Sequence, residues 1–204
     1  MTVNEAKKVI SKHIVASSIE RGFKRNGLYR SLDKVYARTA ALLEENSEAN
    51  KALYNHLEQM LPCIAFYEAL KELTSSKEEA LAVFEKWAFI KIQSCIPAIQ
   101  TMMKTGLYKK IPEIGAVLLE KTFNEEAGFE SRSVETDRGF AVDMTVCPYL
   151  KTCEKYGCPE LTQMFCKSDD VLYGNLHPNL VWGRTQTLGM GGECCDFRLY
   201  LKEE

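Results

Sequence analysis

The chain has 204 residues, with 26 Lys and Arg against 28 Asp and Glu, and 46% of the residues are hydrophobic. This is the composition of a globular protein, and it excludes disorder and a disulfide-dependent miniprotein, because a chain of this length buries a sizeable core without covalent staples. A formal net charge of -2 gives no field that would gather phosphate groups. The sequence therefore predicts no nucleic-acid partner and favours a small molecule.

Neither an export signal nor a membrane span is predicted. The first twenty residues form a charged amphipathic stretch, and no apolar run approaches the ~20 residues that a spanning helix needs. We therefore expect a cytoplasmic protein without a membrane partner. In a reducing compartment the eight cysteines would be thiols, which serve as core filler, metal ligands or reactive groups.

Residues 1–125 carry apolar side chains at helical spacing. A first helix begins at a capping box formed by Thr2 and Glu5 and ends at a break at Arg21-Gly22. A second helix opens at Ser31, where Ser is a favoured N-cap.

A third helix follows a cap at Ser47 and stops near Pro62, since proline lacks the N–H donor. A shorter apolar helix is predicted over residues 63–73. Cys63 and Cys95 fall on helical apolar stripes, which indicates core filler.

The longest helical pattern begins at residues 75–76 and ends at Met103, with a kink expected at Pro97. After a break at Gly106, one more helix has Pro112 near its first turn. These stripes indicate a packed core.

After Gly128 the apolar spacing changes to a two-residue alternation. Two antiparallel pairs are predicted: residues 129–134 with 140–146 around a turn at 137–139, and residues 180–188 with 195–201 around a glycine-rich turn. The sequence thus predicts an α+β fold in which a helical N-terminal part, residues 1–125, precedes a small antiparallel sheet of about four strands with an inserted helix, residues 126–204. Short loops favour one continuous unit.

Four cysteines in the second part raise the question of a metal site: Cys147, Cys153, Cys158 and Cys166. Structural zinc sites favour C-x2-C or C-x4-C knuckles, and no C-x2-C pair occurs among the four. The spacing predicts neither a metal nor another cofactor.

Cys166 and Asp169 are three residues apart in a segment expected to be helical, so they share a face. The carboxylate could accept the thiol proton or relay it to a substrate. The alternative is an inert buried thiol beside a solvated acid.

A second cysteine–acid group, Cys194-Cys195-Asp196, follows the glycine-rich turn. Strand alternation sends Cys195 and Phe197 to one face and Cys194, Asp196 and Arg198 to the other, so one cysteine faces a site. Adjacent cysteines are poor partners for a disulfide.

Arg184 and Thr185 lie in an otherwise neutral strand, where a guanidinium could bind a substrate carboxylate as a fork. The alternatives are a surface arginine or an ion pair with Asp143 or Asp196. His177, which precedes a proline, is either a turn residue or a substrate contact.

Four motifs occur together in order: Cys158-Pro159-Glu160-Leu161, Phe165-Cys166 with Asp169, Arg184-Thr185-Gln186-Thr187-Leu188, and Cys195-Asp196-Phe197-Arg198. This set resembles the L-2-amino-thiazoline-4-carboxylic acid hydrolase family, mainly over residues 140–201. The resemblance implies hydrolytic opening of a carboxylate-bearing cyclic isothiourea to N-carbamoyl-cysteine, on a route to cysteine.

With that resemblance, we expect Arg184 to anchor the substrate carboxylate while the Cys166 thiolate, or a water activated by Asp169, attacks the amidine carbon. Cys195 or Asp196 would donate the proton to the departing sulfur. An ionised Asp169 disfavours the thiolate, so either Asp169 is the base or Lys167 or the helix N-terminus offsets it.

Two further hypotheses stay open: a cysteine-rich module that binds a metal or small ligand without turnover, and a silent family member whose helical part forms a homodimer. The doubled residues leave open whether Cys194 or Cys195 faces the site, and whether Asp169 or Asp170 is the acting acid.

Overall fold

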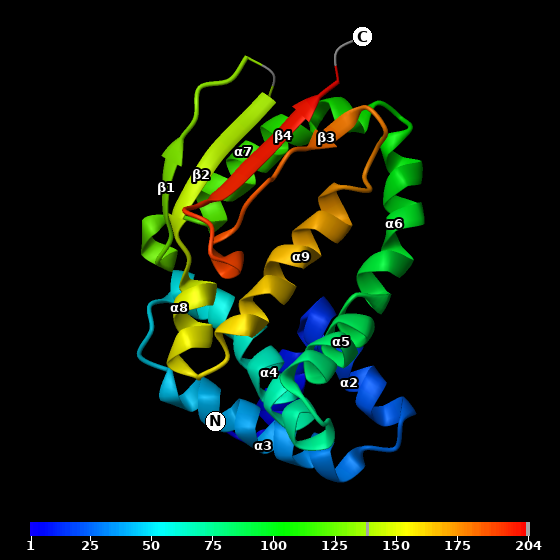
Figure 1. Ribbon diagram of the computed structural model, residues 1–204, viewed down its shortest axis with the longest axis vertical. Coiled ribbons are helices and arrows are strands. Elements are labelled where there is room, and N and C mark those ends of the chain that lie inside the picture. Colours follow the sequence, from blue (N-terminus) through cyan, green and yellow to red (C-terminus); the bar gives the residue numbers. More distant parts are fainter. Residues whose placement is uncertain (138, 203–204) are drawn as a thin grey trace. The chain divides into compact units, whose positions relative to one another are not determined.

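The computed structural model describes residues 1–137 and 139–202 and confirms the α+β class (Figure 1). The chain divides into two compact units, Met1–Ile92 and Gln93–Glu204. This division lies earlier than the change from helices to strands near residue 125, because the last long helix before that point packs on the sheet. That the helical part and the sheet part form one continuous unit stays a prediction.

The first unit is helical. Its elements are α1 (Val3–Lys12), α2 (Ile14–Arg25), α3 (Tyr29–Glu45), α4 (Lys51–Leu73), α5 (Lys77–Ala88) and the start of α6 (Ile90–Met103). The predicted capping box of Thr2 and Glu5 is present on α1. The side chain of Asn50, rather than Ser47, caps α4, and Ser76 caps α5.

The break predicted at Gly22 is wrong. The chain breaks at His13, and α2 continues through Gly22 to Arg25. A Cβ atom at Gly22 would lie 2.4 Å from the ring of Trp87, so this glycine allows α5 to approach α2 closely. Packing therefore explains a glycine that the sequence suggested as a helix end.

Pro62 lies inside α4 and does not end it, so the stop near Pro62 and the separate helix over residues 63–73 are also wrong. A proline in a helix interior costs about 3 kcal/mol. Residues on both sides of it, including Leu61, Cys63 and Ile64, are fully buried, and each large apolar side chain buried contributes about 1.5–3 kcal/mol. Core packing outweighs the missing hydrogen bond, and Cys63 is core filler as expected.

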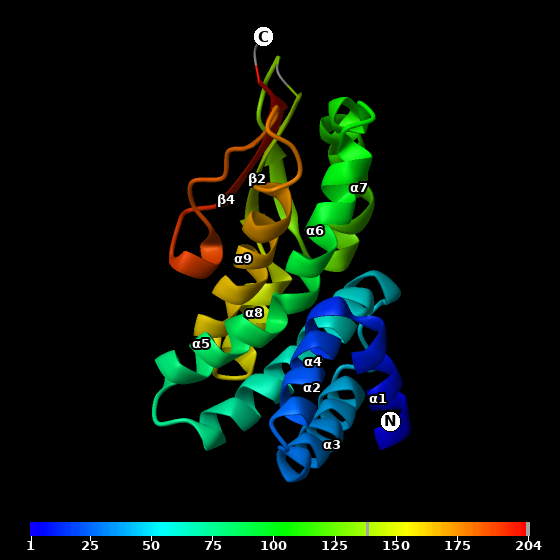
Figure 2. The ribbon, with the colours of Figure 1, turned by 90° about the vertical axis from the view of Figure 1, so that its right-hand side faces the viewer.

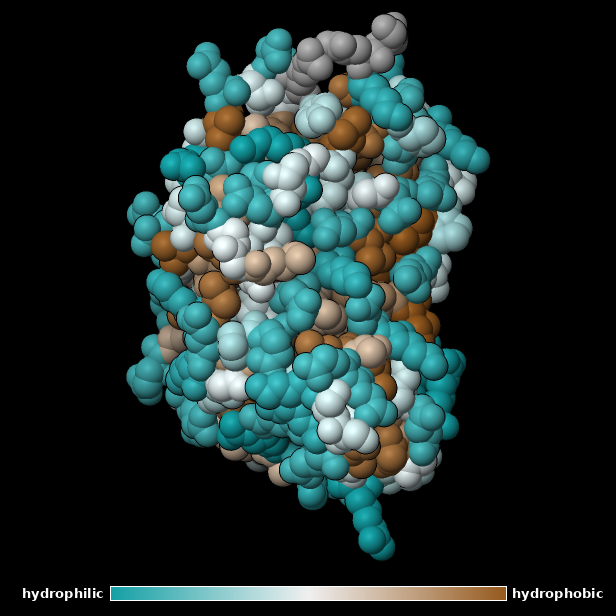
Figure 3. Space-filling model, in the orientation of Figure 1, coloured by the Kyte–Doolittle hydropathy of each residue, from teal (hydrophilic) through white to brown (hydrophobic). Residues whose placement is uncertain are grey.

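The long helical pattern after Ser76 is interrupted at Phe89, and Pro97 lies inside α6. Cys95 is exposed, so its assignment to the core was wrong. Hydrophobic side chains reach the surface along α6, including Met102, which is 58% exposed (Figure 3).

The second unit holds one antiparallel sheet in the order β1-β2-β4-β3 (Figure 1). Its strands are β1 (Glu130–Ser133), β2 (Gly139–Val146), β3 (Leu180–Trp182) and β4 (Cys195–Leu201). The predicted first hairpin is confirmed as β1 and β2, although Arg138 of its turn lies outside the described residues. The second predicted pair is β3 with β4.

The strand predicted to reach residue 188 ends at Trp182. Beyond it, the backbone N–H groups of Thr185 and Gln186 donate to the carboxylate of Asp196 at 2.9 and 2.7 Å. A side chain of the neighbouring strand thus replaces the backbone ladder. The glycine-rich turn contains a short 3-10 segment, Leu188–Met190.

Helices pack against this sheet. The helix α7 (Ile111–Thr122) packs on β2 and β4 and lies on one side of the sheet (Figure 2). Two helices, α8 (Pro148–Lys155) and α9 (Thr162–Tyr173), fall between the strand pairs, where the sequence predicts an inserted helix. Register pairs Phe140 with Leu199, and Met144 with Cys195, so these side chains share one face of the sheet.

A membrane span is not found in the described part of the chain, because none of its helices is both long and apolar enough.

Candidate active site

Cys166 and Asp169 lie on α9, as expected, and Tyr173 continues the same stripe one turn further on. The three side chains face in one direction because they are three and four residues apart. The charges of Cys166 and Asp169 act on each other, which raises the pKa of the acid. The predicted cysteine–acid pair therefore shares one face of α9.

Cys195 comes to Cys166 from β4, and its sulfur also accepts a hydrogen bond from the N–H of Leu188 at 3.3 Å. The backbone of Gly189 packs so close that a Cβ there would lie 3.2 Å from the Cys166 sulfur. Cys194 is buried beside the charged network of Asp143 and Asp196. Of the two adjacent cysteines, Cys195 is therefore the one that meets Cys166.

The pKa of the Cys166 thiol is lowered to about 6. The Cys195 thiol as hydrogen-bond donor is the largest cause, and it outweighs burial; the Thr187 hydroxyl and the positive charge of Arg184 lower the pKa further. The pKa of Cys195 is raised, first by its bond to Cys166 and then by burial.

Thr187 was not singled out from the sequence, although it lies within the third motif. Its side chain is 3% exposed, and its hydroxyl makes no hydrogen bond of ordinary geometry among the described residues. The hydroxyl nevertheless lies close enough to the Cys166 sulfur to lower the pKa of the thiol.

Burial raises the pKa of Asp169 to about 7, and the nearby charges of Cys166 and Asp170 add to that rise, while Arg184 opposes it. The Asp169 side chain still keeps 35% of its surface exposed, since it borders a cavity while protein surrounds it elsewhere. Asp170 is half exposed and does not line that cavity. Of the two adjacent acids, Asp169 is therefore the one that borders the cavity.

Arg184 is almost completely buried, with 3% of its side chain exposed. Its Nη1 donates to Asp169 at 3.2 Å, and its Nη2 donates to the Cys166 carbonyl at 2.6 Å and pairs with Asp170 at 2.6 Å. Arg184 therefore pairs with two acids of α9 and not with Asp143 or Asp196, which the sequence offered as alternatives. The guanidinium fork is occupied within the protein.

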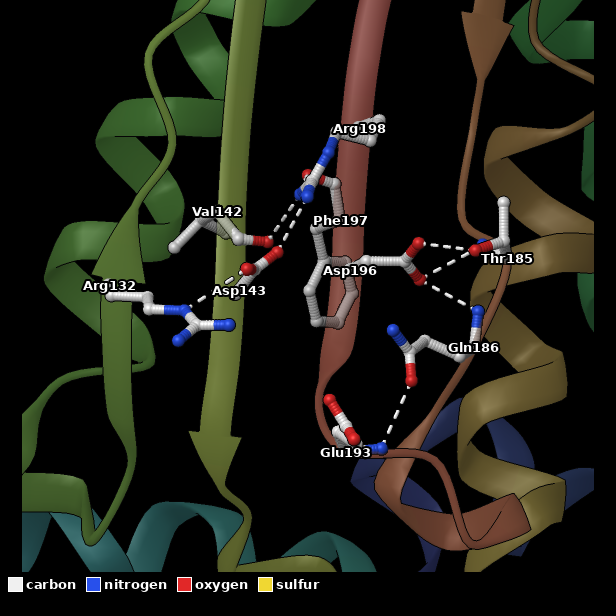
Figure 4. Close-up of polar contacts among 9 residues, drawn as sticks. All are labelled: Arg132, Val142, Asp143, Thr185, Gln186, Glu193, Asp196, Phe197 and Arg198. Atoms are coloured by element: carbon white, nitrogen blue, oxygen red, sulfur yellow. Dashed lines mark hydrogen bonds and ion pairs between the residues drawn. The ribbon is translucent and has the colours of Figure 1, made fainter.

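Asp196 belongs to a different network from the thiols (Figure 4). Its carboxylate accepts hydrogen bonds from the Thr185 hydroxyl at 2.6 Å and from the backbone of Thr185 and Gln186. Burial alone would raise the pKa of Asp196, but these hydrogen bonds lower it overall. An acid held in its ionised form by several donors is a poor proton donor.

Arg198 on β4 belongs to a second group of polar contacts, separate from that of Asp196 (Figure 4). Its guanidinium pairs with Asp143 at 2.6 Å, and Asp143 also accepts from Arg132 at 3.1 Å (Figure 4). The network ties β1, β2 and β4 together. It accounts for the charged residues that alternate with Cys195 and Phe197 along β4.

His177 lies in the loop before β3. Its ring stacks on Tyr108 with centroids 3.8 Å apart, and its Nδ1 accepts from the N–H of Asn179. It does not line the cavity beside Asp169. His177 is thus arranged as a turn residue, which is one of the two alternatives that the sequence left open.

Cys147, which the sequence raised only as one of four candidate metal ligands, is a third thiol near the site. Burial raises its pKa to about 11, and its charge acts on both Cys166 and Cys195. It follows β2, whose Met144 pairs with Cys195 in the sheet. Among the described residues, however, no three His, Cys, Asp or Glu side chains form a group that could hold a metal ion.

A cavity opens beside Asp169 between the sheet, α7 and α9. Asp169 is its one ionisable acid, and Tyr173 is the other residue that α9 contributes. The remaining lining residues are apolar or aromatic: Gly115, Leu118, Leu119, Phe123, Phe140, Trp182, Phe197 and Leu199. Ligand sites in proteins commonly combine such walls with a few polar groups.

The fold and this site define an α+β protein with a cysteine–aspartate pair, of which the aspartate borders an apolar cavity. A family model for L-2-amino-thiazoline-4-carboxylic acid hydrolase matches residues 54–199, which include every residue of the pair and the cavity. The chain belongs to this family. The family name supports hydrolase as its class of activity.

Comparison with curated proteins and with solved structures finds no match.

Proposed function

We propose that this protein hydrolyses a small cyclic amidine of the 2-amino-thiazoline type by covalent catalysis at Cys166. The observation that carries the proposal is the hydrogen bond of Cys166 with Cys195 beside Asp169 on the same helix face, where the thiol pKa is lowered to about 6 and the acid pKa is raised to about 7. Near neutral pH these values favour a thiolate beside a carboxyl group that can still donate a proton. Nucleophilic catalysis with general-acid assistance needs this pair of protonation states.

In the first step, the Cys166 thiolate attacks the carbon between the two nitrogens of the protonated amidine. The ring carbon–sulfur bond then breaks, and Asp169 gives its proton to the departing sulfur. This leaves a thiol on the substrate and an isothiouronium group on Cys166. Because Asp169 starts neutral, the Cys166 thiolate does not lie beside a second anion.

In the second step, ionised Asp169 takes a proton from a water molecule as the oxygen bonds to the same carbon. The carbon–sulfur bond to Cys166 breaks, a proton passes to solvent, and a urea is released. The net change is the addition of one water across the ring carbon–sulfur bond.

Three neighbours are assigned supporting roles. Cys195 and Thr187 stabilise the thiolate by hydrogen bonds, and Arg184 holds Asp169 and the backbone of Cys166 in register. We therefore assign Arg184 to positioning rather than to a substrate carboxylate, since three of its N–H donors already serve Asp169, Asp170 and the Cys166 carbonyl. Thr185 and Asp196 hold the loop between β3 and β4.

The experiment that tests this proposal is the trapping of the covalent intermediate. Protein mixed with 2-amino-2-thiazoline is quenched in acid and digested, and the isothiouronium adduct is sought by mass spectrometry on the peptide that contains Cys166. We expect the adduct in the wild type and in Cys95→Ala, whose exposed thiol lies on α6, and no adduct or turnover in Cys166→Ala. Turnover by folded Cys166→Ala at the wild-type rate would refute covalent catalysis.

We also propose that the protein forms a homodimer through its helical part. Sedimentation velocity can test this.

A further inference from the structure

The sulfur of Cys166 meets a second thiol that comes from a distant part of the chain. Cys166 lies on α9 and Cys195 is the first residue of β4, and a hydrogen bond joins the two side chains. Both sulfurs also lie against the turn of residues 188–190, which packs on α9. The N–H of Leu188 donates to the Cys195 sulfur at 3.3 Å, and a Cβ atom at Gly189 would lie 3.2 Å from the Cys166 sulfur. The fold therefore holds the two thiols together.

The two thiols differ in exposure and in reactivity. Cys166 is partly exposed, whereas Cys195 is only 4% exposed, so a small solute reaches Cys166 first. Oxidants react with the thiolate rather than the thiol, and the pKa of Cys166 is lowered while that of Cys195 is raised. Cys166 is thus the thiol that an oxidant would attack, and Cys195 is a shielded thiol beside it.

We propose that Cys166 and Cys195 form a site of reversible oxidation, at which a small hydroperoxide such as hydrogen peroxide converts the two thiols to a disulfide. Redox-sensitive cysteines are typically accessible and lie next to a second thiol that can resolve the first oxidation product. The effect on activity rests on the proposed function, because the disulfide would remove the nucleophile Cys166. The formation of the disulfide does not depend on that function.

The reaction has two steps. The Cys166 thiolate attacks one oxygen of the peroxide, a sulfur–oxygen bond forms, and the oxygen–oxygen bond breaks. The departing hydroxide takes a proton from solvent and becomes water, and Cys166 becomes a sulfenic acid. The Cys195 sulfur then attacks the Cys166 sulfur, and the hydroxide that leaves takes the Cys195 proton. The two sulfurs are oxidised by two electrons in all, and the peroxide is reduced to two waters.

The segment before β4 allows the two sulfurs to approach each other. A disulfide needs its sulfurs ~2.05 Å apart, so a hydrogen-bonded pair must still close a short distance. Cys195 begins β4 soon after a turn that contains Gly189, Gly191 and Gly192, and glycine has the widest choice of backbone conformations. Met190 of the same turn is 75% exposed, so its side chain does not anchor the turn in the core. A small shift of this turn would bring Cys195 to Cys166.

Two other thiols could compete for Cys166. Strand alternation directs Cys194 to the opposite face of β4, where the charges of Asp143 and Asp196 act on it. Cys147 acts on Cys166 and Cys195 through charge, whereas Cys166 and Cys195 share a hydrogen bond. The geometry therefore favours Cys195 as the partner.

Treatment of the protein with hydrogen peroxide tests the inference. After exposure at neutral pH, remaining thiols are blocked with N-ethylmaleimide, and the digested peptides are analysed by mass spectrometry without reduction. We expect a disulfide between the peptides of Cys166 and Cys195 that dithiothreitol removes, in the wild type and in Cys147→Ala. Oxidation of Cys166 to sulfinic acid without a disulfide, or a bond from Cys166 to Cys147, would overturn the inference.

The adjacent cysteines of β4 provide a matched pair of variants. In Cys195→Ser we expect the disulfide to be lost and Cys166 to be oxidised irreversibly to sulfinic acid, because no thiol resolves the sulfenic acid. In Cys194→Ser the disulfide should form as in the wild type. Loss of the disulfide in Cys194→Ser and its retention in Cys195→Ser would assign the bond to the wrong neighbour and refute the proposed pair.

A third variant keeps both thiols and changes only their approach. In Gly189→Ala the added Cβ would lie 2.8 Å from the methyl group of Thr162 and 3.2 Å from the Cys166 sulfur, which pushes the turn away from α9. We expect the disulfide to form about tenfold more slowly, since the rate depends on access between the sulfurs. Met190→Ala alters an exposed side chain of the same turn and should leave the rate unchanged. Equal rates in the two variants would contradict the role of the turn.

The proposed function and this inference can fail separately. If the disulfide forms but folded Cys166→Ala turns over at the wild-type rate, the oxidation site stands and covalent catalysis falls. If the isothiouronium adduct forms on Cys166 but peroxide gives no disulfide, catalysis stands and the oxidation site falls. If both hold, peroxide should abolish turnover by the wild type, and dithiothreitol should restore it.

Discussion

Arg184, which follows β3, donates a hydrogen bond of 3.2 Å from Nη1 to Oδ2 of Asp169, which lies on α9. The same guanidinium holds the Cys166 carbonyl, so one side chain fixes both members of the cysteine–acid pair. The positive charge lowers the pKa of both groups. Geometry and protonation at this site thus depend on one buried arginine.

Replacement of Arg184 by Met should move the pH dependence of turnover to higher pH. Activity is expected to rise with ionisation of Cys166 near pH 6 and to fall with ionisation of Asp169 near pH 7. Because the positive charge favours both ionised forms, its loss raises both pKa values, and we expect a shift of about one unit with a ~10-fold fall in kcat. Rate profiles from pH 5 to 9 measure this, and profiles that stay in place would show that Arg184 is only structural.

The Cys166 thiol should react with iodoacetamide in its ionised form already near pH 6. Alkylation followed by peptide mass spectrometry has an internal comparison, because Cys147 in the same protein has a pKa raised to about 11 and should react only in strong base. In Cys195→Ala the main stabilising donor is lost, so the midpoint for Cys166 should move up by at least one unit. A midpoint unchanged by that substitution would remove Cys195 from the site.

The Thr187 hydroxyl should affect the thiol without supporting the fold. In Thr187→Val we expect a higher pKa of Cys166. At pH 5, where Cys166 is a neutral thiol that the hydroxyl does not need to stabilise, we expect a free energy of unfolding that is unchanged or higher by up to ~1 kcal/mol, because the buried hydroxyl makes no other hydrogen bond there. Thr39→Val is the matched control, since its hydroxyl on α3 is also buried and unpartnered. It should have the same effect on stability and none on alkylation of Cys166.

Asp169→Asn should stabilise the protein only at higher pH. The folded-state pKa of Asp169 is raised from 3.8 to about 7, so the folded protein holds this proton more tightly, and stability falls as the pH rises from about 4 to 7. The variant should therefore match the wild type near pH 4 and exceed it above pH 7.

Because the side chain is 35% exposed, solvent reduces the gain, and we expect about 1 kcal/mol, or ~3 °C in Tm. Thermal unfolding at pH 4.5 and pH 8 measures the difference. A larger gain at the lower pH would mean that the sign of the shift is wrong.

Gly22→Ala should destabilise the first unit. The added Cβ would lie 2.4 Å from the Trp87 ring, and overpacking of this kind typically costs about 1–3 kcal/mol. Gly115→Ala is a matched control in α7, where the nearest atom would be 3.4 Å away and the higher helix propensity of Ala could add up to ~1 kcal/mol. Equal Tm values for the two variants would contradict the close approach of α2 and α5.

Several helices followed from local signals. The capping box of Thr2 and Glu5 and the position of Pro112 near a helix start depend on residues that are close in the chain, so spacing alone located them. Gly22 and Pro62 misled for the opposite reason. Both interrupt an isolated helix, and both are tolerated because partners distant in the sequence pack against their helices.

The α+β order and the cysteine–acid motifs were determined by the sequence, because strand alternation and helical spacing are properties of neighbouring residues. Which cysteine meets Cys166, which carboxylates occupy Arg184 and what lines the cavity were decided only by the tertiary structure. These contacts join β4, α9 and α7, which are distant in the chain. A spacing rule cannot show how many N–H donors of Arg184 are already bonded within the protein. That number bears on whether Arg184 can bind a substrate carboxylate.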